Sequence, residues 1–175
     1  MKSVPKIDFS WSLFLDRDGV INKKRDGDYV KSVDEFEFLP KAIETITYLS
    51  SLFHKVIVVT NQQGIGKGLM TDMDLKLVHQ HMKQHIKAQG GRIDAIFHAP
   101  QMSSENSPLR KPNIGMALLA KKQFPSIQFE KSIMVGDSLS DMEFAKRNGM
   151  TGIFVGQSDD YLSINSLNEC IDLFR

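Results

Sequence analysis

The sequence has 175 residues, of which 41% are hydrophobic and 25% are charged, as in a folded globular protein. Its 22 basic and 21 acidic residues leave a net charge of +1, which excludes a strongly basic protein drawn as a whole to nucleic acid or to a membrane. The one cysteine, Cys170, excludes an internal disulfide and a zinc site built from several thiolates, so we expect a cytoplasmic protein. The length predicts a single domain over residues 1–175.

Short β-rich segments alternate with segments of helical periodicity along the chain. Strands are predicted at residues 12–15, 55–60, 93–97, 132–135 and 152–155. Helices are predicted at residues 40–53, 71–88, 112–122, 139–148 and 163–174. This alternation predicts an α/β fold with a parallel sheet and helices on both faces. In such sheets the chemistry gathers at the carboxyl ends of the strands, so we look first at the residues that follow each strand.

The first predicted strand runs into Asp16-Arg17-Asp18-Gly19. In extended geometry the two carboxylates point to the same side, and Gly19 allows a sharp turn away from them. Such a pair can divide the work of hydrolysis, because one carboxylate can act as nucleophile or metal ligand while the other transfers a proton. A simple polar turn after a strand has the same composition, so the motif alone leaves both interpretations open.

The second predicted strand ends in Thr60-Asn61-Gln62, whose hydroxyl and amide groups can hold an anionic oxygen or form an ordinary turn. The glycine-rich residues 64–68 that follow fit neither a phosphate-binding loop nor a dinucleotide fingerprint, because required residues are missing at flanking positions. We expect a flexible basic loop over the site, with Lys67 as a candidate substrate contact.

Two later segments carry further charged groups. Arg110 and Lys111 precede a predicted helix start, where cations and free amides would attract an anion, although a solvated pair also fits. Asp137 follows the fourth predicted strand, where a carboxylate suits a hard cation such as Mg²⁺. Asp141 falls in the first turn of the next helix, where it either joins the site or only stabilises the helix dipole. Together the four groups offer the nucleophile, fixed donors and cations that phosphoryl transfer requires.

These segments resemble the four motifs of the haloacid dehalogenase superfamily in their order and spacing. The matching segments are residues 14–20, 59–61, 110–112 and 136–141. The resemblance implies a Rossmann-like sheet and Mg²⁺-dependent phosphatase chemistry through an aspartyl-phosphate. It also implies that Asp16 is the nucleophile, and that Asp18 is the general acid and then the general base.

The same resemblance assigns roles to the remaining residues. Thr60 is expected to bind the phosphoryl oxygens, and Lys111 to neutralise the nucleophile and the phosphate. The Mg²⁺ ion is expected to be held by Asp16, by Asp137 and by Asp18 through its backbone carbonyl. Asn61 and Arg110 are expected to help hold the substrate.

One branch of the superfamily is especially similar, the branch of D-glycero-D-manno-heptose 1,7-bisphosphate phosphatase and histidinol-phosphate phosphatase. The similarity lies in residues 16–22, 29–30, 36–38, 60–65 and 110–116. It implies a small phosphorylated metabolite as the partner, with the heptose bisphosphate first and histidinol phosphate as an alternative. Members of that branch typically carry a Cys/His zinc loop before the Arg-Lys pair. The corresponding residues 98–109 contain no cysteine and one histidine, so we expect no structural zinc, and the exact substrate stays open.

Three other interpretations remain. The Thr-Asn-Gln and Arg-Lys-Pro segments are also similar to those of polynucleotide kinase 3′-phosphatases, although the net charge, one tryptophan and three tyrosines argue against a nucleic-acid substrate. A signalling receiver domain would need a carboxylate after the third strand, where this chain has Phe97-His98-Ala99. A catalytically silent phosphate-binding module would keep the same side chains without turnover.

Several further expectations concern what the chain lacks. No long insertion follows Gly19 or Phe97, so we expect no large cap domain and a site covered at most by the loops 22–38 and 64–70. His81 and His85 have the spacing of a metal-binding helix face, but no third ligand is evident, so an ordinary helix surface is expected. No apolar run is long enough to span a membrane, and a monomer is compatible with the sequence.

Overall fold

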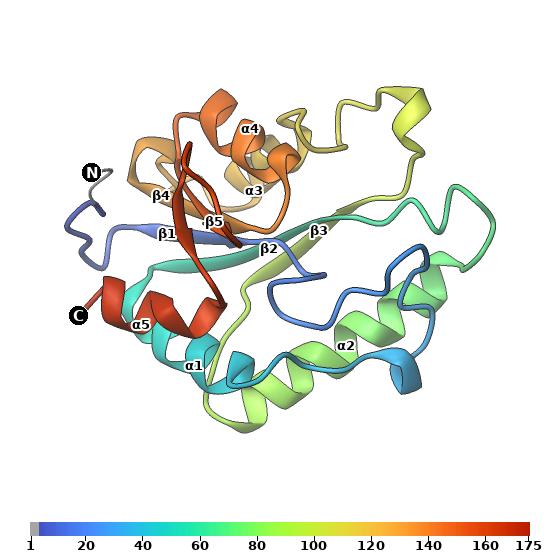
Figure 1. Cartoon of the computed structure of the whole chain (residues 1–175), viewed down its shortest axis with the longest axis horizontal. Helices are drawn as coiled ribbons and strands as arrows, with labels where there is room; N and C mark the ends of the chain where they lie inside the picture. Colours follow the sequence, from blue (N-terminus) through green and yellow to red (C-terminus); the bar gives the residue numbers. More distant parts are fainter. Residues whose placement is uncertain (1–3) are drawn as a thin grey trace.

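The computed structural model describes residues 4–175 and contains one six-stranded sheet with helices on both faces (Figure 1). The strands are β1 (Ser12–Leu15), β2 (Lys55–Asn61), β3 (Ala95–Ala99), β4 (Ser132–Gly136), β5 (Thr151–Val155) and β6 (Leu162–Ile164). Every neighbouring pair is parallel, in the order β3-β2-β1-β4-β5-β6. This is the strand order of the doubly wound folds, and the predicted Rossmann-like α/β fold is confirmed.

The helices form two layers. They are α1 (Ala42–Leu52), α2 (Asp72–Ala88), α3 (Gly115–Gln123), α4 (Leu139–Asn148) and α5 (Cys170–Leu173). Helices α1, α2 and α5 cover one face of the sheet, and α3 and α4 cover the other (Figure 1). No helix within residues 4–175 has the length and apolar character needed to cross a membrane.

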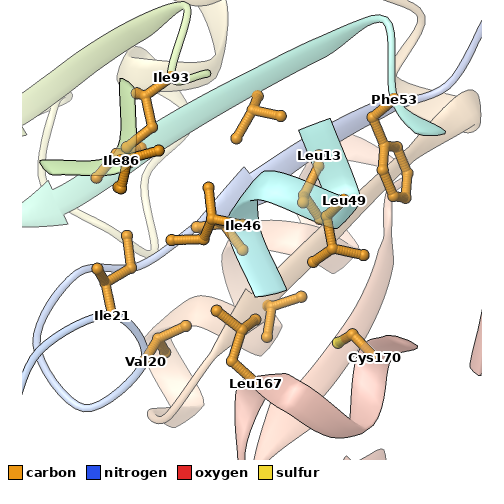
Figure 2. Packing of buried hydrophobic residues seen from close by; sticks show 14 of the residues in the cluster. Leu13, Val20, Ile21, Ile46, Leu49, Phe53, Ile86, Ile93, Leu167 and Cys170 are labelled. Carbon is orange, nitrogen blue, oxygen red and sulfur yellow. The ribbon is translucent and has the colours of Figure 1, made fainter. Parts of the chain in front are cut away.

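Alternate side chains of β1 divide between the two layers. Leu13 and Leu15 pack with α1 and α2, whereas Phe14 packs with α3 and α4. All three are fully buried, which explains why the strand reads as a continuous apolar run. Figure 2 shows the first layer, in which Ile46 and Leu49 of α1 lie between the sheet and the C-terminal segment. Each such side chain contributes about 1.5–3 kcal/mol of burial free energy.

The topology brings the ends of β1 and β4 together. The chain moves outward from β1 through β2 to β3, then returns to place β4 on the other side of β1. Leu15 pairs with Val58 on one side and with Val135 on the other, so β1 and β4 end at nearly the same level, and β2 continues three residues further, to Asn61. The loops after β1, β2 and β3 gather at this end of the sheet, away from both chain termini (Figure 1). Ligands of open α/β sheets bind at this type of crossover.

Four predicted boundaries are wrong by two or three residues: the starts of α1, β3 and α3 and the end of β3. β3 starts at Ala95 instead of residue 93, because Asp94 makes a different pair of hydrogen bonds with Val56 of β2. The amide of Asp94 donates to the carbonyl of Val56, and the carboxylate of Asp94 accepts from the amide of Val56. The helix predicted from residue 112 starts at Gly115, because the residues before it form turns in which the amide of Gly115 donates to the carbonyl of Pro108. As a result Lys111 lies at the carboxyl ends of the strands and is not part of a helix.

The C-terminal segment differs more. The predicted helix over residues 163–174 is replaced by β6, a 3-10 helix (Leu167–Glu169) and the short helix α5. Its first residues pair with β5, where Ile164 lies opposite Val155, and Leu167 and Cys170 then pack on α1. The apolar residues of this segment are spaced as in a helix because they contact β5 and then α1, and not because they form one continuous helix.

The large cap domain that the sequence does not favour is not found within residues 4–175. Between β1 and α1 the chain forms a loop with a 3-10 helix at Val33–Glu35, and after β3 a loop with a second one at Ser103–Glu105.

Candidate active site

A pocket of about 310 Å³ lies at the carboxyl ends of β1, β2 and β4. All seven residues that the sequence analysis assigns to a site line this one pocket: Asp16, Asp18, Thr60, Asn61, Arg110, Lys111 and Asp137. The loop 22–38 adds Lys24, Arg25 and Tyr29 to the wall, and Gln63 comes from the segment after β2. The fold therefore brings together groups that lie up to 121 positions apart in the sequence.

Lys111 lies at the bottom of the pocket and is almost completely buried. Its ammonium group donates to three acceptors, at 2.8 Å to Asp16 Oδ1, 2.6 Å to Asp141 Oδ1 and 2.8 Å to the carbonyl of Val59. Burial alone would lower the pKa of Lys111, but the two carboxylates outweigh it and raise the pKa to about 12. Lys111 is therefore a fixed positive charge against Asp16.

Asp16 has the opposite tendency. Burial is the largest effect and raises its pKa, and the neighbouring carboxylate of Asp141 adds to the rise, so that the pKa reaches about 7 in spite of Lys111. A nucleophilic carboxylate must be ionised. Further positive charge beside Asp16 would lower its pKa and favour the ionised carboxylate.

Asp18 carries three hydrogen bonds. Its Oδ1 accepts from Arg17 Nη2 at 2.8 Å and from Asn22 Nδ2 at 2.9 Å, and its Oδ2 accepts from Gln62 Nε2 at 2.8 Å. Burial by itself would raise the pKa of Asp18, but the charge of Arg17 and these donors hold the pKa below its usual value. The pKa values of Asp16 and Asp18 are therefore shifted in opposite directions by their different surroundings.

The carboxylates of Asp16, Asp137 and Asp141 can each offer an oxygen within 4.8 Å of the others, the one such cluster among residues 4–175. Three hard oxygen donors suit Mg²⁺ or a similar divalent cation. Asp137 reaches the cluster because Gly19 has no side chain: a Cβ there would lie 2.2 Å from Asp137 Oδ2, and Gly19 also has φ of +87°. Lys24 donates to the same oxygen at 3.0 Å.

The side-chain cluster differs from the expected metal ligands in one member. Asp141 is in it, fully buried, and Asp18 is not, because both carboxylate oxygens of Asp18 face other donors. The expected ligand from Asp18 is its backbone carbonyl, so this remains a prediction. Asp141 also caps α4, where its Oδ2 accepts from the amide and hydroxyl of Ser138, so the two alternatives for this residue are compatible.

The polar residues after β2 have separate tasks in the structure. Both ends of the Asn61 amide are paired with the backbone of Lys111, at 2.9 Å and 3.1 Å, so Asn61 holds the Lys111 segment against β2. Thr60 Oγ1 accepts from Gln62 Nε2 at 2.9 Å. Arg110 lines the pocket and has no carboxylate partner in the described part of the chain; the hydrogen bond of its guanidinium to the carbonyl of Gln101 is long at 3.4 Å.

Arg110 and Lys111 do not sit at a helix N-terminus, since α3 begins four residues after Lys111. The expected anion site of helix amides is therefore wrong, and the charge of Lys111 acts directly on Asp16. Lys67 does not line the pocket; its ammonium lies 5.4 Å from the centre of the Tyr29 ring. The rings of His81 and His85 on α2 lie 4.1 Å apart and are tilted by 48°, and neither residue belongs to a cluster of potential metal ligands within residues 4–175.

Sequence reasoning missed Arg17, Asn22 and Lys24, which the structure places at the site, and named Gln62 only as one of the polar groups that follow the second strand. Arg17, Asn22 and Gln62 hold Asp18, and Lys24 reaches Asp137. Arg17, Asn22 and Gln62 lie within the segments that define the motifs, which was the available signal. Lys24 comes from a loop whose path could not be predicted.

The chain is similar to known phosphatases over most of its length. The family model described as polynucleotide kinase 3 phosphatase matches residues 13–159. The D-glycero-alpha-D-manno-heptose-1,7-bisphosphate 7-phosphatase of Mycobacterium bovis is 42% identical over 135 residues, which are 77% of this chain and 71% of that protein. The enzyme of the same name from Campylobacter jejuni is 34% identical over 170 residues, covering 94% and 95% of the two chains.

A solved structure extends this similarity to three dimensions. It is the D,D-heptose 1,7-bisphosphate phosphatase of B. bronchiseptica in complex with magnesium and phosphate. Its TM-score is 0.83 at 28% identity, and the match covers 93% of this chain and 96% of that one. The fold, the charged pocket and the sequence similarity agree, and the chain belongs to the polynucleotide kinase 3 phosphatase family, a family of phosphatases within the haloacid dehalogenase superfamily.

Proposed function

We propose that this phosphatase is a Mg²⁺-dependent enzyme that removes the 7-phosphate of D-glycero-D-manno-heptose 1,7-bisphosphate through a phosphorylated Asp16. The observation that carries the proposal is the pairing of Asp16 with the buried ammonium of Lys111 beside a second carboxylate, Asp18, in one pocket. The substrate rests on the relatives, because proteins named for this reaction match up to 94% of the chain.

The chain's own residues supply most of the proposed chemistry. Asp16 attacks the phosphorus in line, and the bond from phosphorus to the ester oxygen breaks. Lys111 balances the negative charge on Asp16 and on the phosphoryl oxygens, and Thr60 donates its hydroxyl to one of those oxygens. Asp18 gives a proton to the departing ester oxygen and afterwards takes one from the water that hydrolyses the aspartyl-phosphate.

Asp16, Asp137 and the backbone carbonyl of Asp18 are the proposed ligands of Mg²⁺, with Asp141 beside them. The three clustered carboxylates fit a hard divalent cation. When bound, Mg²⁺ supplies positive charge that offsets the phosphoryl oxygens and keeps Asp16 ionised.

The rim of the pocket suits a substrate with a second anionic group. Three cations line it beside the buried Lys111: Lys24, Arg25 and Arg110. Lys24 is paired with Asp137, and Arg25 with Asp28 and Glu35, whereas Arg110 has no acidic partner among the residues described. We propose that Arg110 contacts the rest of the substrate. Asn61 contributes by holding the Lys111 segment in place.

One competing substrate is favoured by a specific observation. The matching family takes its name from a phosphatase that acts on polynucleotides, so a nucleic-acid 3′-phosphate belongs in the test. Histidinol phosphate is the third candidate, because the sequence resembles that branch as well.

The test is phosphate release with and without Mg²⁺ from the heptose 1,7-bisphosphate, histidinol phosphate, a 3′-phosphorylated oligonucleotide and para-nitrophenyl phosphate. We expect Mg²⁺-dependent release and the highest kcat/KM on the heptose bisphosphate. Preference for the oligonucleotide would refute the substrate and keep the chemistry. Activity that survives in Asp16→Asn would refute the nucleophile, and no release from any compound would favour a silent phosphate-binding module.

A further inference from the structure

Arg17 is the largest fully buried side chain among residues 4–175, and the proposed reaction gives it no task. It stands between Asp16 and Asp18 in the chain, and its guanidinium extends toward α2 behind the pocket. Burying a guanidinium is costly unless its donors find partners, and an apolar side chain of similar volume would fill the space without that cost. The contacts of this one residue therefore call for an explanation.

Two contacts hold the terminal nitrogens of the guanidinium, and its Nε has no hydrogen-bond partner among the residues described. Nη2 donates to Asp18 Oδ1 at 2.8 Å, and Nη1 lies 3.2 Å from Nε2 of His79 on α2. A guanidinium cannot accept a hydrogen bond, so His79 Nε2 must be the acceptor and the imidazole is neutral, with its proton on Nδ1. Burial and the charge of Arg17 lower the pKa of His79 to about 3, which agrees with this form. His79 thus anchors Arg17 to a rigid helix.

The two oxygens of Asp18 are not equivalent. Oδ1 accepts two hydrogen bonds, from Arg17 and Asn22, and both of its lone pairs are used. Oδ2 accepts one, from Gln62, and keeps a free lone pair. A proton can therefore reside on Oδ2 while every donor around the carboxyl group keeps its partner. A proton on Oδ1 would instead face the N–H groups of Arg17 and Asn22, and one of these two hydrogen bonds would be lost.

We propose that Arg17, anchored by His79, is a positioning residue that fixes Asp18 so that Oδ2 is the oxygen that exchanges the proton. This rests on the proposed function, in which Asp18 is the general acid and base. In the first half-reaction the Oδ2–H bond breaks and the proton moves to the ester oxygen as its bond to phosphorus breaks. In the second, a water proton moves to Oδ2 as the water oxygen bonds to phosphorus, and Asp16 is released as the carboxylate.

The test uses the need of the leaving group for a proton. The alkoxide of a sugar phosphate or of glycerol phosphate must be protonated as it leaves, whereas the phenolate of para-nitrophenyl phosphate leaves without help. The quantity compared is kcat/KM, because it covers the steps only up to cleavage of the ester. The variants are Arg17→Met, Arg17→Lys and His79→Gln, with Asp18→Asn as the reference and His85→Gln, an exposed histidine of the same helix, as the matched control.

We expect Arg17→Met to lower kcat/KM about 30- to 100-fold on heptose bisphosphate and on glycerol phosphate, within the about 10²–10⁴-fold that general acid catalysis supplies. On para-nitrophenyl phosphate the loss should stay below about 3-fold, and KM should change little on all three. Arg17→Lys should recover part of the loss, and His79→Gln should show a weaker version of the same pattern. His85→Gln should behave as the wild type.

Two results would overturn the inference, and they are distinguishable. If Asp18→Asn discriminates between leaving groups but Arg17→Met and His79→Gln lose the same factor on every substrate, Arg17 has only a structural role. If Asp18→Asn itself does not discriminate, Asp18 is not the general acid, and the proposed mechanism fails along with the inference. His79→Gln keeps the test valid if Arg17→Met does not fold, because Gln retains an acceptor for the guanidinium.

Discussion

The buried contact between Asp141 and Lys111 should be a major contribution to the stability of the site. Asp141 is fully buried, its Oδ1 lies 2.6 Å from the ammonium of Lys111, and its Oδ2 accepts the hydrogen bonds that cap α4 at Ser138. Asp141→Ala removes both interactions. A surface equivalent of the cap alone exists at the start of α2, where Asp74 makes the same reciprocal bonds with Thr71.

The difference between Asp141→Ala and Asp74→Ala therefore isolates the buried ion pair. Removing one partner of a buried pair costs about 3–5 kcal/mol when the other is left alone. Lys111 keeps Asp16 and the carbonyl of Val59, so we expect a value nearer to that of one hydrogen bond to a charged group, about 2–3 kcal/mol.

The assay is unfolding in guanidinium chloride followed by the fluorescence of Trp11, the one tryptophan, which is buried. A chelator is present so that no metal ion contributes. If Asp141→Ala does not fold, Asp141→Asn retains an acceptor for the cap and tests the charge alone. Equal free energies of unfolding for Asp141→Ala and Asp74→Ala would refute the reasoning, because the ion pair would then contribute nothing.

Three further predictions concern other parts of the molecule. Because Lys24 shares Asp137 Oδ2 with any cation bound there, Lys24→Met should tighten Mg²⁺ binding about 2- to 5-fold, measured by calorimetric titration, and a weaker affinity would contradict this. The pKa of His79 falls from 6.5 to about 3 on folding, so the unfolded chain binds the proton first and stability is lost as the pH falls through about 6.5. The loss should approach about 1.4 kcal/mol per pH unit, and His79→Gln but not His85→Gln should reduce it in unfolding experiments at about pH 7.5 and 5.5. Burial raises the pKa of Cys170 to about 12, so its thiol should react with Ellman's reagent only after unfolding, and rapid reaction of the native protein would show that the C-terminal segment opens.

The central strands could be predicted from the sequence, whereas the C-terminal segment could not. The apolar runs of β1, β2 and β4 could be read within one residue, because burial on both faces leaves a clear signature. The segment from residue 162 could not, because its apolar residues satisfy β5 and α1 in turn. Its spacing alone does not separate these contacts from those of a helix.

The site shows the same division. Asp16, Asp18 and Asp137 could be placed in one pocket because each follows a strand, and the parallel sheet brings such strand ends together, whereas Lys111 was indicated by the charged segment before the next helix. Asp141 was left open between a site residue and a helix-dipole role, and its contact with Lys111, like that of Lys24 with Asp137, could not be predicted because each contact joins residues far apart in the sequence. Arg17 is the clearest case: it lies between two predicted catalytic residues, yet its role depends on a histidine 62 positions away.

The most direct test of the account is to trap the phosphorylated enzyme. Protein mixed with Mg²⁺ and heptose 1,7-bisphosphate is quenched in acid within the first turnover, digested, and searched by mass spectrometry for the peptide that contains Asp16. The account predicts phosphate on Asp16 in the wild type, more of it in Asp18→Asn because hydrolysis of the intermediate lacks its base, and none in Asp16→Asn. Turnover of the substrate with no phosphate on Asp16 at any quench time would contradict the account.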